Sequence, residues 1–241
     1  MKVFQEVQDK ISKFENGEIF SYSDFNISNE KFLALSKSLS LLYKRGILRK
    51  ISKGLYYKPE QSIFGELSPT ETDILENFLK KSKKNIGYIS GTNIYRNMGL
   101  TTQLSREFVI MNDTRQGMTE IQNIVIKFVK SPVLEPITNI KILQFLDAIT
   151  DIKKIPACTP TEAIPIFISK IKKMSNEERQ ELVKFAKYYK PQTRALVGAF
   201  IELVGEKNLS LILKKTLNQL TFFKIYISKD VLINKNNWNI Q

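Results

Sequence analysis

The sequence predicts an α+β fold that is mostly helical. Residues 139–220 repeat apolar side chains at helical spacing, and β-prone runs are confined to short stretches near residues 47–57 and 106–129. The chain has 241 residues and a net charge of +13, which is high for this length and favours a polyanionic partner. We expect two domains, residues 1–62 and 63–241, the second mixed α/β to about residue 135 and mainly helical after it.

The first 28 residues predict three small elements. A helix over residues 2–14 would place Val3, Val7, Ile11 and Phe14 on one side. The apolar pair Ile19-Phe20 predicts a short strand, and residues 23–27 predict a short helix.

Residues 31–58 carry eight basic side chains and no acidic one. Residues 29–45 predict a helix whose apolar face is Phe32, Leu35, Leu39 and Leu42, and Gly46 is placed to end it. The β-prone runs 47–51 and 55–57 are separated by Ser52-Lys53-Gly54, which indicates a hairpin. The order of helix, strand, helix, helix and hairpin is typical of a winged helix-turn-helix.

In that arrangement the helix at 29–45 reads a DNA major groove and the hairpin is the wing. A solvated basic face is the alternative interpretation of the charge. Leu33 and Leu41 share the outer face of the helix, where a leucine can contact a thymine methyl or pack on the second domain. The candidate DNA-binding residues are Lys31, Lys37, Ser40, Lys44, Arg45, Arg49, Lys50 and Lys53.

The middle of the chain mixes both kinds of element. Residues 59–65 are interpreted as a linker, and Ser68-Pro69-Thr70-Glu71 predicts a helix start with Ser68 as the cap. A short helix is expected at 91–98. Short strands are expected at 86–89, 106–111 and 123–129, with Gly117 in the loop between the last two.

From residue 139 the chain is expected to be helical. Thr159 and Ser175 each precede a glutamate by three residues, as in a capping box, and Pro165 is expected to kink its helix. Residues 194–204 are apolar on nearly all sides, which predicts a buried core helix. A further helix is expected at 208–220 and a strand at 222–228.

The residue inventory argues against an enzyme. The chain has no histidine and a single cysteine, Cys158, which removes histidine-based nucleophile chemistry and thiolate metal cages. No glycine-rich phosphate loop occurs, so we expect no cofactor and no metal. Carboxylate catalysis stays open, although the acids lie mostly at helix starts. The absence of an 18-residue apolar run predicts no membrane span, and the cysteine usage favours the cytoplasm.

Three further stretches carry a family resemblance. Gly91-Thr92-Asn93-Ile94-Tyr95-Arg96-Asn97-Met98-Gly99-Leu100-Thr101-Thr102-Gln103 resembles the motif after the winged helix of AbiEi-type antitoxins of bacterial abortive-infection systems. The stretch from Tyr189-Lys190-Pro191-Gln192 to Glu202, and the stretch Leu217-Asn218-Gln219-Leu220-Thr221, resemble C-terminal blocks of one branch of that family. Together with Lys53-Gly54-Leu55-Tyr56, the resemblance covers nearly the whole chain.

The resemblance implies an antitoxin that represses its own operon by binding double-stranded operator DNA and counters a nucleotidyltransferase-like toxin through its second domain. It implies no catalytic residues. The chain departs from the family at Leu41 and Lys53, where arginine is common, and lysine lacks the bidentate fork that reads guanine. We expect a monomer or weak dimer. Candidate contacts for the toxin or its RNA are Arg179, Lys184, Lys187 and Lys190.

Two other functions are compatible with the sequence. One is a winged-helix regulator whose second domain senses a small ligand or dimerises, without a toxin. The other is an accessory protein that binds RNA through the same basic surface. A neighbouring nucleotidyltransferase-like gene would distinguish the antitoxin from the regulator.

Overall fold

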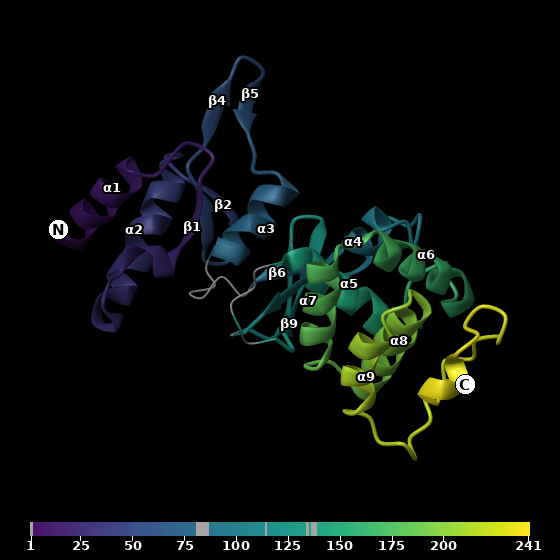
Figure 1. The fold of residues 1–241 in the computed structure, drawn as a ribbon. Coiled ribbons are helices and arrows are strands. Elements are labelled where there is room, and N and C mark those ends of the chain that lie inside the picture. Colours follow the sequence, from purple (N-terminus) through teal and green to yellow (C-terminus); the bar gives the residue numbers. More distant parts are fainter. Residues whose placement is uncertain (1, 81–86, 114, 134, 136–138) are drawn as a thin grey trace. The chain divides into compact units, whose positions relative to one another are not determined.

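The structure is a computed structural model that describes residues 2–80, 87–113, 115–133, 135 and 139–241 (Figure 1). The chain forms two compact units: Met1–Lys83 with Thr119–Ile124, and Lys84–Met118 with Val125–Gln241. Helices predominate over strands in the described residues, which confirms the α+β, mostly helical class. Within this part of the chain no helix has the length and apolar character to cross a membrane.

The first unit begins with a small helix-and-sheet arrangement. Its elements are helix α1 (Lys2–Ser12), strand β1 (Ile19–Ser21), two 3-10 turns (Tyr22–Phe25 and Asn29–Lys31), helix α2 (Phe32–Lys44), and strands β2 (Arg49–Ser52) and β3 (Leu55–Tyr57). Strand β3 pairs antiparallel with both β1 and β2, so the sheet order is β1-β3-β2. The 3-10 turn Tyr22–Phe25 stands in place of the short helix expected at 23–27. The helix expected at 29–45 begins at Phe32, after the 3-10 turn Asn29–Lys31.

The apolar face predicted for α2 is largely the core of this unit. Leu35, Leu39 and Leu42 are buried against residues of α1, β1 and β3. Phe32 was expected on the same face but is 45% exposed, and its ring meets the edge of Tyr22 at 5.1 Å. Phe32 is the first residue of the helix, and helical side chains tilt toward the N-terminus, so its ring lies beyond the packed turns.

The linker expected at residues 59–65 is instead a second hairpin. Strands β4 (Glu60–Ser62) and β5 (Gly65–Leu67) pair antiparallel, with Ser62 opposite Gly65. The Ser62 hydroxyl donates to the Gly65 carbonyl at 2.8 Å and accepts from the Phe64 amide at 3.2 Å, which closes the turn. Ile63 and Phe64 form its tip and are each 93% exposed.

Helix α3 (Glu71–Lys80) follows, and its cap differs from the expected one. The Thr70 amide donates to the Asp73 carboxylate at 2.8 Å, and the Asp73 amide donates to the Thr70 hydroxyl at 3.3 Å. Thr70 is therefore the capping residue rather than Ser68, because Asp73 three residues later can return the hydrogen bond.

The four-stranded sheet is mixed. Its strands are β6 (Tyr88–Ser90), β7 (Glu107–Asn112), β8 (Gly117–Ile121) and β9 (Ile124–Lys130), and helix α4 (Thr92–Asn97) follows β6. The order is β6-β7-β9-β8; β6 runs antiparallel to β7, and β7 runs parallel to β9. Gly117 was expected in a loop but begins β8. Ile86, the first residue of the strand expected at 86–89, lies outside the described residues.

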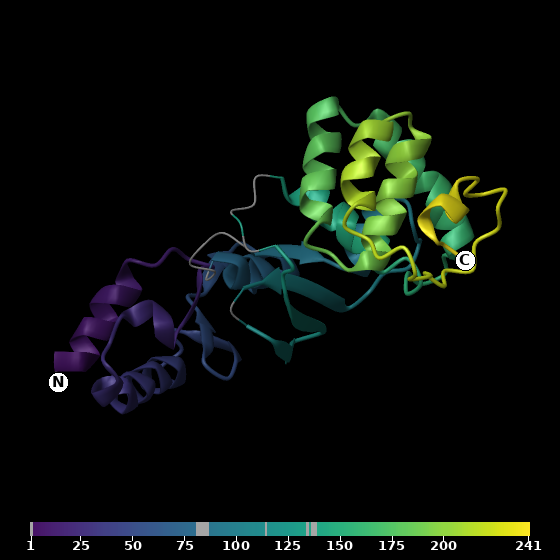
Figure 2. The same cartoon turned by 60° about the horizontal axis from the view of Figure 1, so that its bottom comes forward.

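The rest of the second unit is a helical bundle (Figure 2). Its helices are α5 (Ile140–Thr150), α6 (Pro160–Lys173), α7 (Asn176–Ala186), α8 (Pro191–Leu203) and α9 (Lys207–Lys214). The capping boxes predicted at Thr159 and Ser175 are present. Pro165 lies inside α6, which continues beyond it to Lys173.

Helix α8 is the centre of the bundle, as predicted. It packs against α5, α6, α7 and α9, and residues 195–201 are buried. The Phe200 ring stacks on Phe167 with 6.1 Å between ring centroids.

The C-terminal segment is anchored on α8. The 3-10 turn Lys235–Trp238 packs on that helix, and the Trp238 indole donates to the Glu202 carboxylate at 2.7 Å. A Cβ on Gly198 would lie 2.1 Å from the indole, so the glycine makes room for it. The strand expected at 222–228 is wrong: only Phe223 forms a bridge, with Ile240. Phe223, Ile225 and Ile227 are nevertheless buried in alternation.

Candidate nucleic-acid interface and a cavity in the second unit

The outer face of α2 carries the basic residues expected there. Lys37 and Lys44 are exposed, and Ser40, between them in sequence, is half-buried. Spacings of three and four residues place the three side chains on one face. Leu33 extends this face and is 74% exposed.

The β2–β3 hairpin presents a second group of cations, one on strand β2 and one in the turn. Lys50 and Lys53 are exposed, and Gly54 has a positive φ of 79° with the Tyr22 ring 3.0 Å from where a Cβ would lie. The hydrogen bond with the Tyr56 hydroxyl lowers the pKa of Tyr22, and the charges of Lys50 and Lys53 act in the same direction. Tyr22 was not among the predicted site residues, because its proximity to the hairpin arises from the fold.

The two arginines of this region are engaged within the unit. The Arg49 guanidinium donates to the Gly46 carbonyl at 2.8 Å and forms an ion pair with Glu66 of β5 at 2.7 Å. The Arg45 guanidinium lies over the Phe4 ring of α1, 5.8 Å from its centroid. Arg49 is therefore partly buried and paired, whereas Arg45 stays exposed beside the ring, so the lysines and Arg45 are the cations that are available to a ligand.

The lysines of this surface have no acidic partner among the residues that the structure describes. Within the described residues no ion pair involves Lys31, Lys37, Lys44, Lys50 or Lys53. Uncompensated exposed cations on a helix and on a neighbouring hairpin turn suit the evenly spaced phosphates of a nucleic acid.

The four basic residues proposed as toxin or RNA contacts in the second domain differ in their exposure to solvent. Arg179 was expected to be exposed, but its side chain is only 16% exposed. It forms an ion pair with Glu206 at 3.0 Å and donates to the Ile171 and Lys172 carbonyls. Lys184 is exposed and pairs with Glu135 at 3.0 Å, whereas Lys187 and Lys190 are exposed without a described ion pair. Arg179 therefore serves to join α7 to its neighbours.

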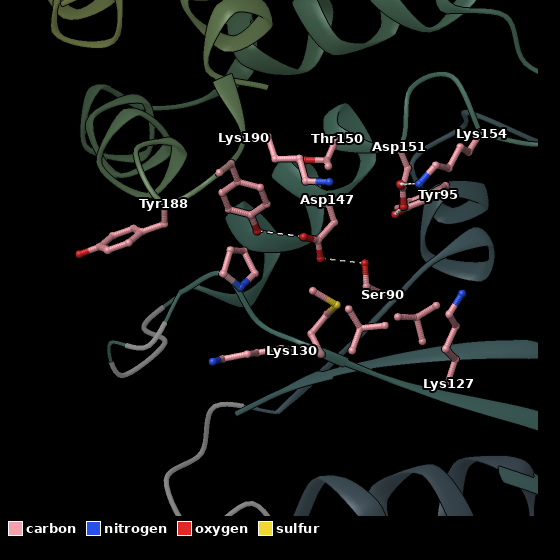
Figure 3. Close-up of a pocket in the computed structure, with 15 residues that line it drawn as sticks. Ser90, Tyr95, Lys127, Lys130, Asp147, Thr150, Asp151, Lys154, Tyr188 and Lys190 are labelled. Carbon is pink, nitrogen blue, oxygen red and sulfur yellow. Dashed lines mark hydrogen bonds and ion pairs between the residues drawn. The ribbon is translucent and has the colours of Figure 1, made fainter. Parts of the chain in front are cut away.

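A cavity of about 540 Å³ lies within the second unit, between the sheet and the helices (Figure 3). Figure 3 shows Lys127 and Lys130 on the strand side, with Asp147 of α5 opposite them. Of the residues proposed from sequence, only Lys190 lines it. The others were missed: Ser90, Tyr95, Val109, Met111, Lys127, Val129, Lys130, Pro132, Asp147, Thr150, Asp151, Lys154, Tyr188 and Tyr189.

Asp147 is the buried carboxylate of this cavity. It accepts hydrogen bonds from the Ser90 hydroxyl at 2.8 Å and the Tyr189 hydroxyl at 2.9 Å. Burial raises the pKa of Asp147 to about 6 against the opposing effect of these hydrogen bonds. The sequence did contain a signal for this residue, since Asp147 is the one acid in the run from Ile142 to Ile149, which is apolar apart from Asp147 and Gln144.

Two of the stretches that carry the family resemblance meet at the cavity. Tyr95, from Gly91–Gln103, donates to Asp151 at 2.9 Å, and Tyr189 begins the stretch that ends at Glu202. Asn93 instead holds the loop after α4, exchanging two hydrogen bonds with the Ser105 backbone. In the described residues no three His, Cys, Asp or Glu side chains are grouped so that they could hold a metal ion.

The molecule is thus an α+β protein with an exposed lysine surface in one unit and, in the other, a cavity lined by apolar, aromatic and charged side chains. The chain belongs to the family described as "Family of unknown function (DUF6088)", which matches residues 6–183. It is also similar to the solved structure of the RV2827C protein from Mycobacterium tuberculosis, with 9% identity and a TM-score of 0.41 over 91% of this chain and 83% of that chain. No curated protein matches it.

Proposed function

We propose that this protein is a DNA-binding antitoxin without enzymatic activity, which acts in the cytoplasm. Its first unit is interpreted as a winged helix-turn-helix in which α2 enters the major groove and the β2–β3 hairpin is the wing. The observation that carries the proposal is the set of exposed lysines on these two elements, Lys37, Lys44, Lys50 and Lys53, which have no described acidic partner.

This surface is better suited to phosphate contact than to base readout. Lysine supplies a point charge, and Arg49, which could read a guanine edge, is paired with Glu66; Arg45 is exposed beside the Phe4 ring. Leu33, exposed on the outer face of α2, suits a thymine methyl. We therefore expect affinity to be strongly electrostatic and sequence preference to be modest.

The DNA-binding half is tested by the salt dependence of binding to the protein's own upstream DNA. Each phosphate contact contributes about −0.9 to the slope of log affinity against log salt, so affinity should fall steeply between about 50 and 200 mM salt. Lys37→Ala/Lys44→Ala and Lys50→Ala/Lys53→Ala should each weaken binding and reduce the slope by about two. Lys172→Ala/Lys173→Ala, the same charge change in exposed residues of α6, is the control.

Two results would contradict this half of the proposal. One is an affinity that does not change with salt. The other is equal loss of binding in the control variant, which would mean that only net charge matters. A structured RNA that competes better than the duplex would favour the RNA-binding function instead.

The antitoxin half rests on the sequence resemblance. It is tested by co-expressing the protein with a nucleotidyltransferase-like toxin encoded beside it and measuring growth rescue. Lys184→Ala/Lys187→Ala should reduce rescue with little change in thermal stability, because both side chains are exposed and the Lys184–Glu135 ion pair that is lost lies at the surface. Unchanged rescue in this variant would remove these residues from the proposed contact.

A second function is favoured by the cavity. A regulator whose second unit senses a small ligand would need such a lined, partly enclosed volume, and it would need no toxin. A genome neighbourhood without a nucleotidyltransferase-like gene, combined with DNA binding, would support this regulator.

A further inference from the structure

The extended segment of residues 222–228, in the yellow part of the ribbon in Figures 1 and 2, presents two aromatic rings to solvent. Phe222 is 58% exposed and Tyr226 is 77% exposed, with the exposed Lys224 between them. Successive side chains of an extended chain point to opposite sides, so these three share one side. The opposite side is buried and consists of Phe223, Ile225 and Ile227.

Hydrogen bonds fix the backbone of this segment. The Phe223 amide donates to the Asn239 carbonyl at 2.8 Å. The Ile225 and Tyr226 amides both donate to the Gln241 carbonyl. Tyr226 has a positive φ of 62°, which is uncommon for a residue with a bulky side chain, and such a conformation persists only where its surroundings impose it. The Tyr226 ring is therefore held out in solvent by a fixed backbone.

Positive charge is concentrated at the same segment. The Lys153 ammonium donates to the Lys224 carbonyl at 3.0 Å, and the Lys235 ammonium donates to another carbonyl of the segment at 2.6 Å. Among the described residues none of these three lysines forms an ion pair. Residues 216–241 contain a single acidic side chain, that of Asp230. A ligand at the two rings would therefore lie in a positive field.

Exposed rings beside unpaired cations suit the bases and phosphates of a single-stranded nucleic acid. Proteins that bind single strands with little sequence preference stack bases on aromatic side chains and place cations along the backbone. A duplex offers no such base faces, because its bases are stacked on one another. Lysine is depleted in protein–protein interfaces, so the alternation of rings and lysine does not favour a protein partner.

We propose that this segment binds a single strand of RNA or DNA, with bases stacked on Phe222 and Tyr226 and phosphates at Lys153 and Lys224. The proposed contacts all belong to the second unit. The inference does not depend on duplex binding by α2 or on a toxin, so it can fail while those proposals stand, and the reverse.

The test measures fluorescence anisotropy of labelled oligouridylate and oligothymidylate of about twelve nucleotides, a length within the range of single-strand sites. The full chain carries Lys37→Ala/Lys44→Ala, so that α2 contributes less to binding. At least one strand should bind, and the tighter of the two identifies RNA or DNA as the ligand. Absence of binding to either strand at submillimolar protein concentration would overturn the proposal.

Variants of the rings test stacking. In the same background, Tyr226→Leu should weaken binding about ten-fold through loss of one stacked base, whereas Tyr226→Phe, which keeps the ring, should bind like its parent. Phe222→Leu should also weaken binding, and its backbone is not in the left-handed region, so strain does not complicate the result. Equal binding by Tyr226→Leu and Tyr226→Phe would exclude stacking at this residue and contradict the proposal.

Variants of the lysines test the phosphate contacts. Lys153→Ala/Lys224→Ala should reduce the slope of log affinity against log salt by about 1.4, since each phosphate contact on a single strand contributes about 0.7. Lys127→Ala/Lys130→Ala, the same charge change in exposed residues of β9, should leave the slope unchanged. Equal slopes in the two double variants would mean that only net charge matters.

A membrane surface is the competing ligand for exposed rings beside lysines. The parent and Tyr226→Leu are therefore also sedimented with vesicles of phosphatidylcholine and phosphatidylglycerol. Vesicle binding that is tighter than strand binding and that Tyr226→Leu retains would assign the segment to a lipid surface and overturn the proposal, because leucine keeps the apolar body but has no ring on which a base can stack.

Discussion

Replacing Asp147 by asparagine should stabilise the protein at neutral pH, although it alters a hydrogen-bonded residue of the core. The carboxylate is buried on α5, and its two hydrogen bonds come from neutral hydroxyls. Asparagine keeps the shape and an acceptor oxygen. The Tyr189 hydroxyl also lies 3.4 Å from the Leu143 carbonyl, to which it can donate if the amide nitrogen faces it.

The expected increase in the free energy of unfolding follows from the pKa of Asp147. Burial, the largest influence, and the nearby charge of Asp151 raise this pKa from 3.8 to about 6, a difference of about two pH units or about 3 kcal/mol. Because the folded-state pKa is the higher one, the folded chain binds the proton more tightly. The free energy of unfolding therefore decreases as pH rises from about 4 to about 6, and the full cost is present above that range.

The assay is urea unfolding of the parent and Asp147→Asn at several pH values, followed by fluorescence of Trp238. Trp238 is the only tryptophan in the sequence and is buried against α8, so it reports on the second unit. The variant should be more stable than the parent by up to about 3 kcal/mol at about pH 7.5, less any cost of fitting the amide, and this advantage should shrink by about 3 kcal/mol on going to about pH 4.

Asp230→Asn, an exposed carboxylate of the same unit, is the matched control. Stability profiles of parent and Asp147→Asn that run parallel across this pH range would refute the reasoning. That result would mean that Asp147 titrates alike in the folded and unfolded chain and is not desolvated.

Three further changes test the packing of the second unit. Gly198→Ala should destabilise it by about 1–3 kcal/mol and shift Trp238 emission toward the red, because the new Cβ would overlap the indole; unchanged emission would contradict the contact. Phe200→Ala should cost about 3–5 kcal/mol in urea unfolding through the cavity it leaves, and a parent-like midpoint would place α8 at a surface rather than in the core. Thr159→Ala should cost about 1 kcal/mol through loss of the α6 cap, whereas Thr159→Ser should cost little; equal losses would exclude the capping hydroxyl as the cause.

The sequence by itself determined the elements that are encoded by residues close together in the chain, through apolar spacing and helix caps. The spacing of Leu35, Leu39 and Leu42 identified the buried face of α2, and the capping boxes at Thr159 and Ser175 identified the starts of α6 and α7. The all-round apolar pattern of residues 194–204 identified the central helix of the bundle. These features depend on neighbours within about one helical turn, so a single sequence displays them.

Other features of the sequence were misinterpreted because their local signal is short or because their partners are distant. The hairpin β4–β5 was taken for a linker because its strands are only three residues long. The alternating residues 222–228 were taken for a strand, but the only bridge they form in the described chain is with Ile240 at the C-terminal end. The need for glycine at position 198 is visible only in the structure, where Trp238, forty residues away in sequence, packs against it.

Tertiary contacts also decided which charged side chains are available to a ligand. Glu66 holds Arg49 and Glu206 holds Arg179, across separations of 17 and 27 residues, so charge counting alone could not distinguish them from the free lysines. The cavity assembles Ser90, Lys127, Asp147 and Lys190 from four separate segments. Packing of the sheet against the helices brings these polar groups together. A periodic pattern within one helix or strand does not show which segments will meet in the fold.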